Sequence, residues 1–74
     1  MFVRTQNKRQ LIEVKHVKIG ANVKQVVAVN PHVDIPSHNT VLGDYDTEVR
    51  ALLVLDLVML ALADKKPVFE MPKY

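Results

Sequence analysis

Between Thr47 and Asp64 the chain reads TEVRALLVLDLVMLALAD, with apolar residues on nearly every side of the helix that such a run would form. Most of these residues are strong helix formers. Asp46 or Thr47 can cap the first turn, and Pro67 lies where a helix must end. The pattern predicts one helix over residues 47–64.

Two apolar stripes run along this predicted helix when it is wound at about 100° per residue. We expect the first to pack on a sheet as ordinary core; it comprises Ala51, Leu55, Val58 and Leu62, flanked by Leu52 and Met59. The opposite stripe, bordered by Asp56 and Arg50, comprises Val49, Leu53, Leu57 and Leu60.

The apolar side chains of the opposite stripe must be shielded from water by another surface. Burying four Val or Leu side chains is worth about 6 to 12 kcal/mol, and a domain of this length has a total stability of roughly 4 to 11 kcal/mol. A second copy, the chain's own strands or a membrane would provide the covering. A membrane is disfavoured, because the run from Ala51 to Ala63 is too short to span one and contains Asp56. We favour a homo-oligomer, a dimer first of all, with Val49, Leu53, Leu57 and Leu60 as its interface.

Shorter patterns predict strands over residues 1–4, 11–19, 23–29, 40–45 and 68–71. The alternation of the second run slips by one near Lys15 and His16, as a β-bulge would produce. Residues 20–22 favour a hairpin turn, and the run VKQVVAV at 23–29 favours a central strand. Pro67 and Pro72 favour an edge position for the last strand. Residues 30–39 are typical of a loop, with a short extended piece at 33–35.

These elements predict an α+β fold with a single domain over residues 1–74. A small, mostly antiparallel sheet of about four to five strands, in the order β-β-β-β-α-β, is expected to pack on one long apolar helix.

The charge of the chain is unevenly distributed, although its net value is only +2. Residues 31–74 contain four cations and seven acids, whereas residues 1–30 contain one acid, Glu13, and six cations, which are Arg4, Lys8, Arg9, Lys15, Lys18 and Lys24. The simplest explanation for this excess of cations is that lysines occupy the solvent-exposed faces of strands. Contacts of these six cations with nucleic acid are the alternative, although the chain holds few aromatic residues for base stacking.

Cysteine is absent, so the chain has neither disulfides nor thiolate metal sites. The first ten residues, MFVRTQNKRQ, lack the apolar run of a secretion signal. We therefore expect cytoplasmic synthesis without export.

Three pieces of the chain resemble short uncharacterised phage and prophage proteins of low-GC Gram-positive bacteria. They are RTQNKRQLI at 4–12, LGDYDTEVRALLVLD at 42–56 and VFEMP at 68–72, and together they cover under half of the chain. The resemblance implies a phage or prophage origin without a known activity. It also implies a location in the host cytoplasm or in the virion.

One departure from that family falls on the predicted interface. The helix of the similar proteins typically reads T-x-E-R-A-L-E-V-L-D-E-I, with acids where this chain has Val49, Leu53 and Leu57. If these residues form an interface, it is a property of this chain rather than of the family.

Residues that could carry chemistry are sparse. Ser37 and His38 are neighbours but lack the G-x-S-x-G turn of a hydrolase. His32, Asp34 and His38 have the side chains of metal ligands without a recognised spacing, and His16 is expected to be a partly exposed strand residue. Two glycines, Gly20 and Gly43, are too few for a phosphate-binding loop. We predict no catalytic, cofactor-binding or metal-binding residues.

The sequence thus predicts a non-enzymatic structural or interaction module that self-associates through helix 47–64. Its partners are a second copy and other phage or host proteins, without a cofactor or a membrane. A nucleic-acid-binding accessory protein that uses the basic N-terminal half is the alternative.

Overall fold

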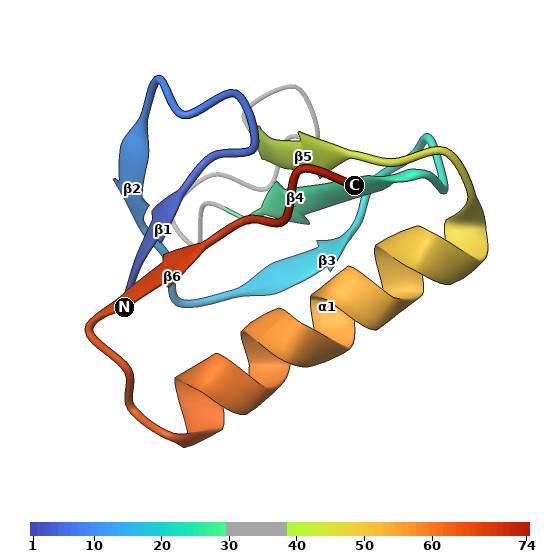
Figure 1. Cartoon of the computed structure of the whole chain (residues 1–74). Helices are drawn as coiled ribbons and strands as arrows, with labels where there is room; N and C mark the ends of the chain where they lie inside the picture. Colours follow the sequence, from blue (N-terminus) through green and yellow to red (C-terminus); the bar gives the residue numbers. More distant parts are fainter. Residues whose placement is uncertain (30–38) are drawn as a thin grey trace.

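The computed structural model describes residues 1–29 and 39–74, and it shows the predicted α+β class (Figure 1). The described residues form six strands in two three-stranded sheets and one helix, rather than one sheet of the expected size. The elements are β1 (Phe2–Arg4), β2 (Leu11–Glu13), β3 (Val17–Ile19), β4 (Gln25–Ala28), β5 (Thr40–Asp44), α1 (Glu48–Ala63) and β6 (Val68–Glu70).

The first sheet has the order β2-β1-β6. Strand β1 pairs antiparallel with β2 and parallel with β6, so that Val3 lies between Ile12 and Phe69 in one row. Val3 is completely buried and its two neighbours are half-buried, because this row faces the core. The predicted edge position of the last strand is confirmed, since β6 has a partner on one side only.

The second sheet has the order β3-β4-β5, with both pairings antiparallel. The hairpin turn at residues 20–22 and the central position of the VKQVVAV run, here β4, are confirmed. The register shifts opposite Val26 and Val27, because Leu42 is an extra residue in β5. This irregularity accompanies the burial of the Leu42 side chain in the core.

The prediction of one bulged strand over residues 11–19 is wrong. Residues 11–13 belong to the first sheet and residues 17–19 to the second. Val14 lies between them, fully buried, and its N–H donates to the carbonyl of Met1. The slip in the hydrophobic alternation marks the point where the chain leaves one sheet for the other, because a bulge and a change of sheet both shift the phase of the pattern by one residue.

Helix α1 packs against β3 and β4 and contributes four buried residues, Ala51, Val54, Val58 and Ala61. Ala51 and Val58 belong to the stripe predicted as core, but Leu55 and Leu62 are only half-buried, and Leu52 and Met59 are exposed. The buried stripe is thus rotated toward Val54 and Ala61. Ala and Val side chains let the helix axis lie close to the sheet, and this closeness places the longer Leu side chains at the margin.

Both ends of the helix are defined by hydrogen bonds. The Thr47 hydroxyl accepts from the N–H of Arg50 at 3.1 Å, as its predicted capping role requires. At the other end, the N–H groups of Lys65 and Lys66 donate to the carbonyls of Leu62 and Ala61, which is the Schellman arrangement. Lys65 adopts a φ of 56°, a conformation that favours glycine.

Lys65→Gly should therefore stabilise the protein by about 1 kcal/mol, because glycine adopts the left-handed conformation without a Cβ clash. The measurement is the free energy of unfolding from urea denaturation at low protein concentration. Lys66→Gly removes the same charge at a residue whose φ is not positive. This control should not stabilise, and an equal gain in both variants would show that charge rather than backbone conformation is responsible.

Gly43 lies directly beneath the ring of Tyr45. A Cβ added at Gly43 would lie 2.7 Å from the Tyr45 hydroxyl oxygen and 2.9 Å from Cε2 of the ring. Tyr45 is buried in the core cluster, so its ring has little freedom to move aside. Close approach of the ring, and not a special φ, is what requires glycine here.

Gly43→Ala should lower the free energy of unfolding by about 1 to 3 kcal/mol, since the added methyl overpacks a buried site. Gly20→Ala provides the comparison, because the nearest atom to its added Cβ is a methyl carbon of Val27 at 3.1 Å. Urea denaturation of the two variants should show the larger loss for Gly43→Ala. A loss at Gly20 as large as that at Gly43 would contradict the role given to the Tyr45 ring.

Candidate interaction surface on helix α1

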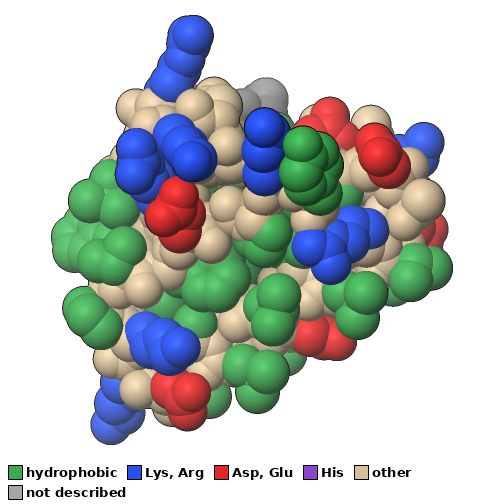
Figure 2. All heavy atoms as spheres, viewed as in Figure 1, with side chains coloured by type: hydrophobic (Ala, Val, Ile, Leu, Met, Phe, Trp, Pro, Cys, Tyr) green, Lys and Arg blue, Asp and Glu red, His purple; other side chains and the backbone are tan. Residues whose placement is uncertain are grey.

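The side of α1 that points away from the sheets carries six large apolar side chains. Their exposed fractions range from 43% to 68%, and we call this set the outer face: Val49, Leu52, Leu53, Leu57, Met59 and Leu60. Figure 2 shows apolar side chains along the course of α1, with charged side chains between them. The four residues predicted as an interface are therefore accessible in the single chain.

The orientation of α1 explains why these side chains reach solvent. The four buried residues fix which side of the helix meets β3 and β4. At about 100° per residue, Val49, Leu53 and Leu60 then lie on the opposite side. The outer face is exposed because the helix is apolar all round and the described strands cover only one side of it.

Asp56 lies within the outer face. One turn away along the helix are Leu52 and Leu60, and the Asp56 side chain is exposed. In the part of the chain that the structure describes, the one ion pair joins Lys8 and Glu70, so Asp56 has no cationic partner there. The carboxylate therefore interrupts an otherwise apolar surface and stays hydrated.

The two ends of α1 carry opposite charge. Three exposed acids surround its N-terminal end, Asp44, Asp46 and Glu48. At its C-terminal end the exposed acid Asp64 is followed by two exposed lysines, Lys65 and Lys66, so the lysines outnumber the acid there. The lysines line a shallow hollow of about 400 Å³ together with Met1, Phe2, Leu62 and Pro67. Each cluster is favourable at its own end of the helix dipole.

Beside the acidic end, three side chains hold the segment that follows β6. The Tyr45 hydroxyl donates to the carbonyl of Pro72 at 2.9 Å, Gln6 Nε2 donates to that of Lys73 at 2.7 Å, and Arg50 Nε donates to that of Tyr74 at 2.6 Å. Gln6 Oε1 also accepts from the N–H of Asp44 at 2.8 Å. Figure 1 shows this segment crossing from β6 toward β5. The bonds fix the segment against β5 and the first turn of α1.

A hollow of about 240 Å³ lies at this junction, lined by Asp44, Tyr45, Asp46, Arg50, Lys73 and Tyr74. Its charged side chains have both signs and are partly committed to the hydrogen bonds described above. Burial raises the pKa of the Tyr45 hydroxyl to about 12, and the nearby charge of Arg50 partly offsets this rise. Tyr45 therefore stays protonated and serves as a hydrogen-bond donor in the fold, not as a base.

The raised pKa of Tyr45 predicts a loss of stability at high pH. An unfolded tyrosine ionises near pH 10, whereas folded Tyr45 ionises near 12. The stabilising contribution is therefore complete below pH 10 and is progressively lost as the pH rises toward 12, by at most about 3 kcal/mol at about 1.4 kcal/mol per pKa unit. Urea denaturation across this range measures it. Tyr45→Phe is the control, because lysine ionisation is common to both proteins, and parallel pH profiles would contradict the assignment.

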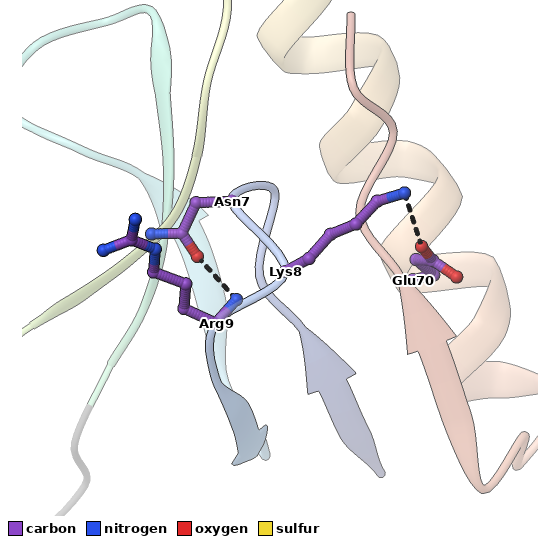
Figure 3. A network of polar contacts seen from close by, with 4 residues as sticks. All are labelled: Asn7, Lys8, Arg9 and Glu70. Atoms are coloured by element: carbon purple, nitrogen blue, oxygen red, sulfur yellow. Dashed lines mark hydrogen bonds and ion pairs between the residues drawn. The ribbon is translucent and has the colours of Figure 1, made fainter.

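The six cations of the basic N-terminal half are all exposed but lie on different elements. Arg4 is on β1, Lys18 is on β3, and the others are in turns and connections, Lys8, Arg9, Lys15 and Lys24. Figure 3 shows that Lys8 and Arg9 point in opposite directions from their turn. Lys8 Nζ lies 3.8 Å from Glu70 of β6, which offsets part of its charge. The six cations are thus distributed over several elements, and one of them is paired with an acid.

The residues weighed for catalysis or metal binding, His32, Asp34, Ser37 and His38, lie outside the described residues, as does the extended piece expected at 33–35. Over residues 1–29 and 39–74 no group of three or more His, Asp or Glu side chains is placed to bind a metal ion. In the same ranges, no helix combines the length and the apolar content that crossing a membrane requires.

Comparison of the chain with protein-family models, with curated proteins and with solved structures gives no match in any of the three.

Sequence reasoning missed two parts of this surface. Leu52 and Met59 were assigned to the core margin but belong to the outer face. The positions of the small residues could have indicated the buried side of the helix, since Ala and Val lie nearest the sheet. The contacts of Gln6, Tyr45 and Arg50 with residues 72–74 span up to 67 positions, and no local pattern indicates them.

Proposed function

We propose that this protein is a non-enzymatic structural or interaction module that self-associates through the outer face of α1. One observation carries the proposal: six large apolar side chains on one helix are accessible to solvent in the single chain. Large apolar side chains gathered in this way on an exposed face mark interaction sites in folded proteins. A second copy satisfies it with a self-complementary contact, the commonest route to a closed oligomer.

The size of the surface sets the expected strength of association. A helix of 16 residues is about 24 Å long, and with a face about 10 Å wide it offers a footprint of about 240 Å². A standard stable interface buries about 800 Å² per partner. A contact through α1 alone is therefore weak and reversible, and we expect it to need micromolar or higher protein concentrations.

The resemblance to short phage and prophage proteins gives the context that we propose for this module. It supports a role in a phage-infected or lysogenic cell, in the cytoplasm or the virion, with self-association as the property that the chain contributes. Since the similar proteins carry acids in place of Val49, Leu53 and Leu57, we infer that the association belongs to this chain rather than to the whole group.

The proposal predicts that Leu53→Glu combined with Leu57→Glu abolishes self-association without unfolding the chain. Both side chains are about half exposed, so the fold loses little burial, while two buried carboxylates would be unpaired in any dimer. Sedimentation velocity over a concentration series measures association, and circular dichroism measures the fold. We expect the wild type to shift toward a larger species and the double variant to stay monomeric.

Val23→Glu combined with Val41→Glu is the matched control. These valines have similar exposure and lie outside α1, and the substitutions change the net charge equally. The control should associate as the wild type does. A wild type that remains monomeric at every concentration rejects the proposal, as does equal dissociation in both variants. A monomer that binds duplex DNA in a salt-dependent manner would instead support the nucleic-acid alternative.

A further inference from the structure

We propose that the self-association surface pairs with a second copy in which α1 runs antiparallel, about a two-fold axis near Asp56. This inference rests on the proposed function and adds the orientation and register of the partner. The candidate occupant is another molecule of this chain, and the distribution of charge and apolar residues along α1 determines how it lies.

The charges at the two ends of α1 favour the antiparallel orientation. In a parallel pair the acids Asp44, Asp46 and Glu48 of both copies, which outnumber Arg50, would meet at one end. Lys65 and Lys66 of both copies, which outnumber Asp64, would meet at the other end. An antiparallel pair brings the acidic end of each helix to the basic end of its mate. The two helix dipoles are then also antiparallel, so the end charges and the dipoles both favour this orientation.

The same alignment fixes the register. When the end near Asp46 and Glu48 lies beside Lys65 and Lys66 of the mate, the midpoint between the clusters falls close to residue 56. A two-fold axis there relates each apolar residue before Asp56 to one after it. Val49 then meets Ala63, seven residues to either side of the axis, and Leu53 meets the pair Met59 and Leu60.

Asp56 lies close to its own mate in this arrangement. Two like charges near the axis lower the affinity, consistent with the weak association expected from the size of the surface. The apolar contacts on both sides of Asp56 hold the pair together.

The absence of cysteine from the chain makes disulfide trapping the decisive test. Three single-cysteine variants are needed, Asp56→Cys, Val49→Cys and Ala63→Cys. In the antiparallel pair the two copies of residue 49 are 14 positions apart along the helix axis, or about 21 Å, whereas a disulfide requires Cα atoms within about 7 Å. We expect Asp56→Cys to cross-link with itself under mild oxidation, and each of the other two to do so only when mixed together.

A parallel, in-register pair gives the opposite result, because Val49→Cys and Ala63→Cys would each cross-link alone and gain nothing from mixing. That outcome overturns the inference but leaves the proposed self-association intact. Asp56→Cys in the Leu53→Glu, Leu57→Glu background controls for random collision and should lose the cross-link. Sedimentation of the unmodified chain reports separately on the proposed function, so a monomeric wild type rejects both proposals.

Discussion

The close packing of α1 on β3 and β4 is the constraint from which the other features of this protein follow. Ala51, Val54, Val58 and Ala61 form the only fully buried stripe on the helix. Their small side chains bring the helix close to the sheet, and this closeness fixes its rotation about its own axis. Once the rotation is fixed, the large Leu and Met residues cannot also reach the core. The exposed outer face is therefore a direct consequence of how the core is built.

The contacts around Tyr45 also help to fix the position of α1 relative to the sheets. Tyr45 lies between the end of β5 and the start of α1, packs over Gly43 and donates to the carbonyl of Pro72. Gln6 links the chain after β1 to β5 and to the segment after β6, so residues from both sheets meet at one point. Next to this junction the Thr47 cap determines where the helix begins, and the hydrogen bonds at its C-terminal end determine where it stops.

Local patterns were sufficient to predict the α+β class, the helix with a cap at Asp46 or Thr47, the central β4 and the edge position of β6. These features depend on propensity, capping and proline, which are local properties. Two sheets in place of one could not be predicted, because the phase slip near Lys15 has the same pattern whether a strand bulges or changes partner. The rotation of the buried stripe toward Val54 was missed for a related reason. Hydrophobicity alone predicts that Leu rather than Ala or Val faces the sheet, whereas close packing of the helix favours the smaller Ala and Val at that position.

The arrangement of charge around the outer face is what would distinguish the proposed interface from a site of uncontrolled aggregation. A purely apolar helix face would accept neighbours in any orientation, and repeated contacts of that kind give open-ended assemblies. Here Asp56 interrupts the face at its middle, and acids and lysines of opposite sign flank its two ends. Each charge penalises the alignments that bury it unpaired or bring it near its like. An antiparallel mate brings opposite charges together at both ends and leaves one unfavourable contact near the axis. In the proposed pair, the charged residues would therefore limit how many copies associate and in which direction, while the apolar residues would supply the attraction.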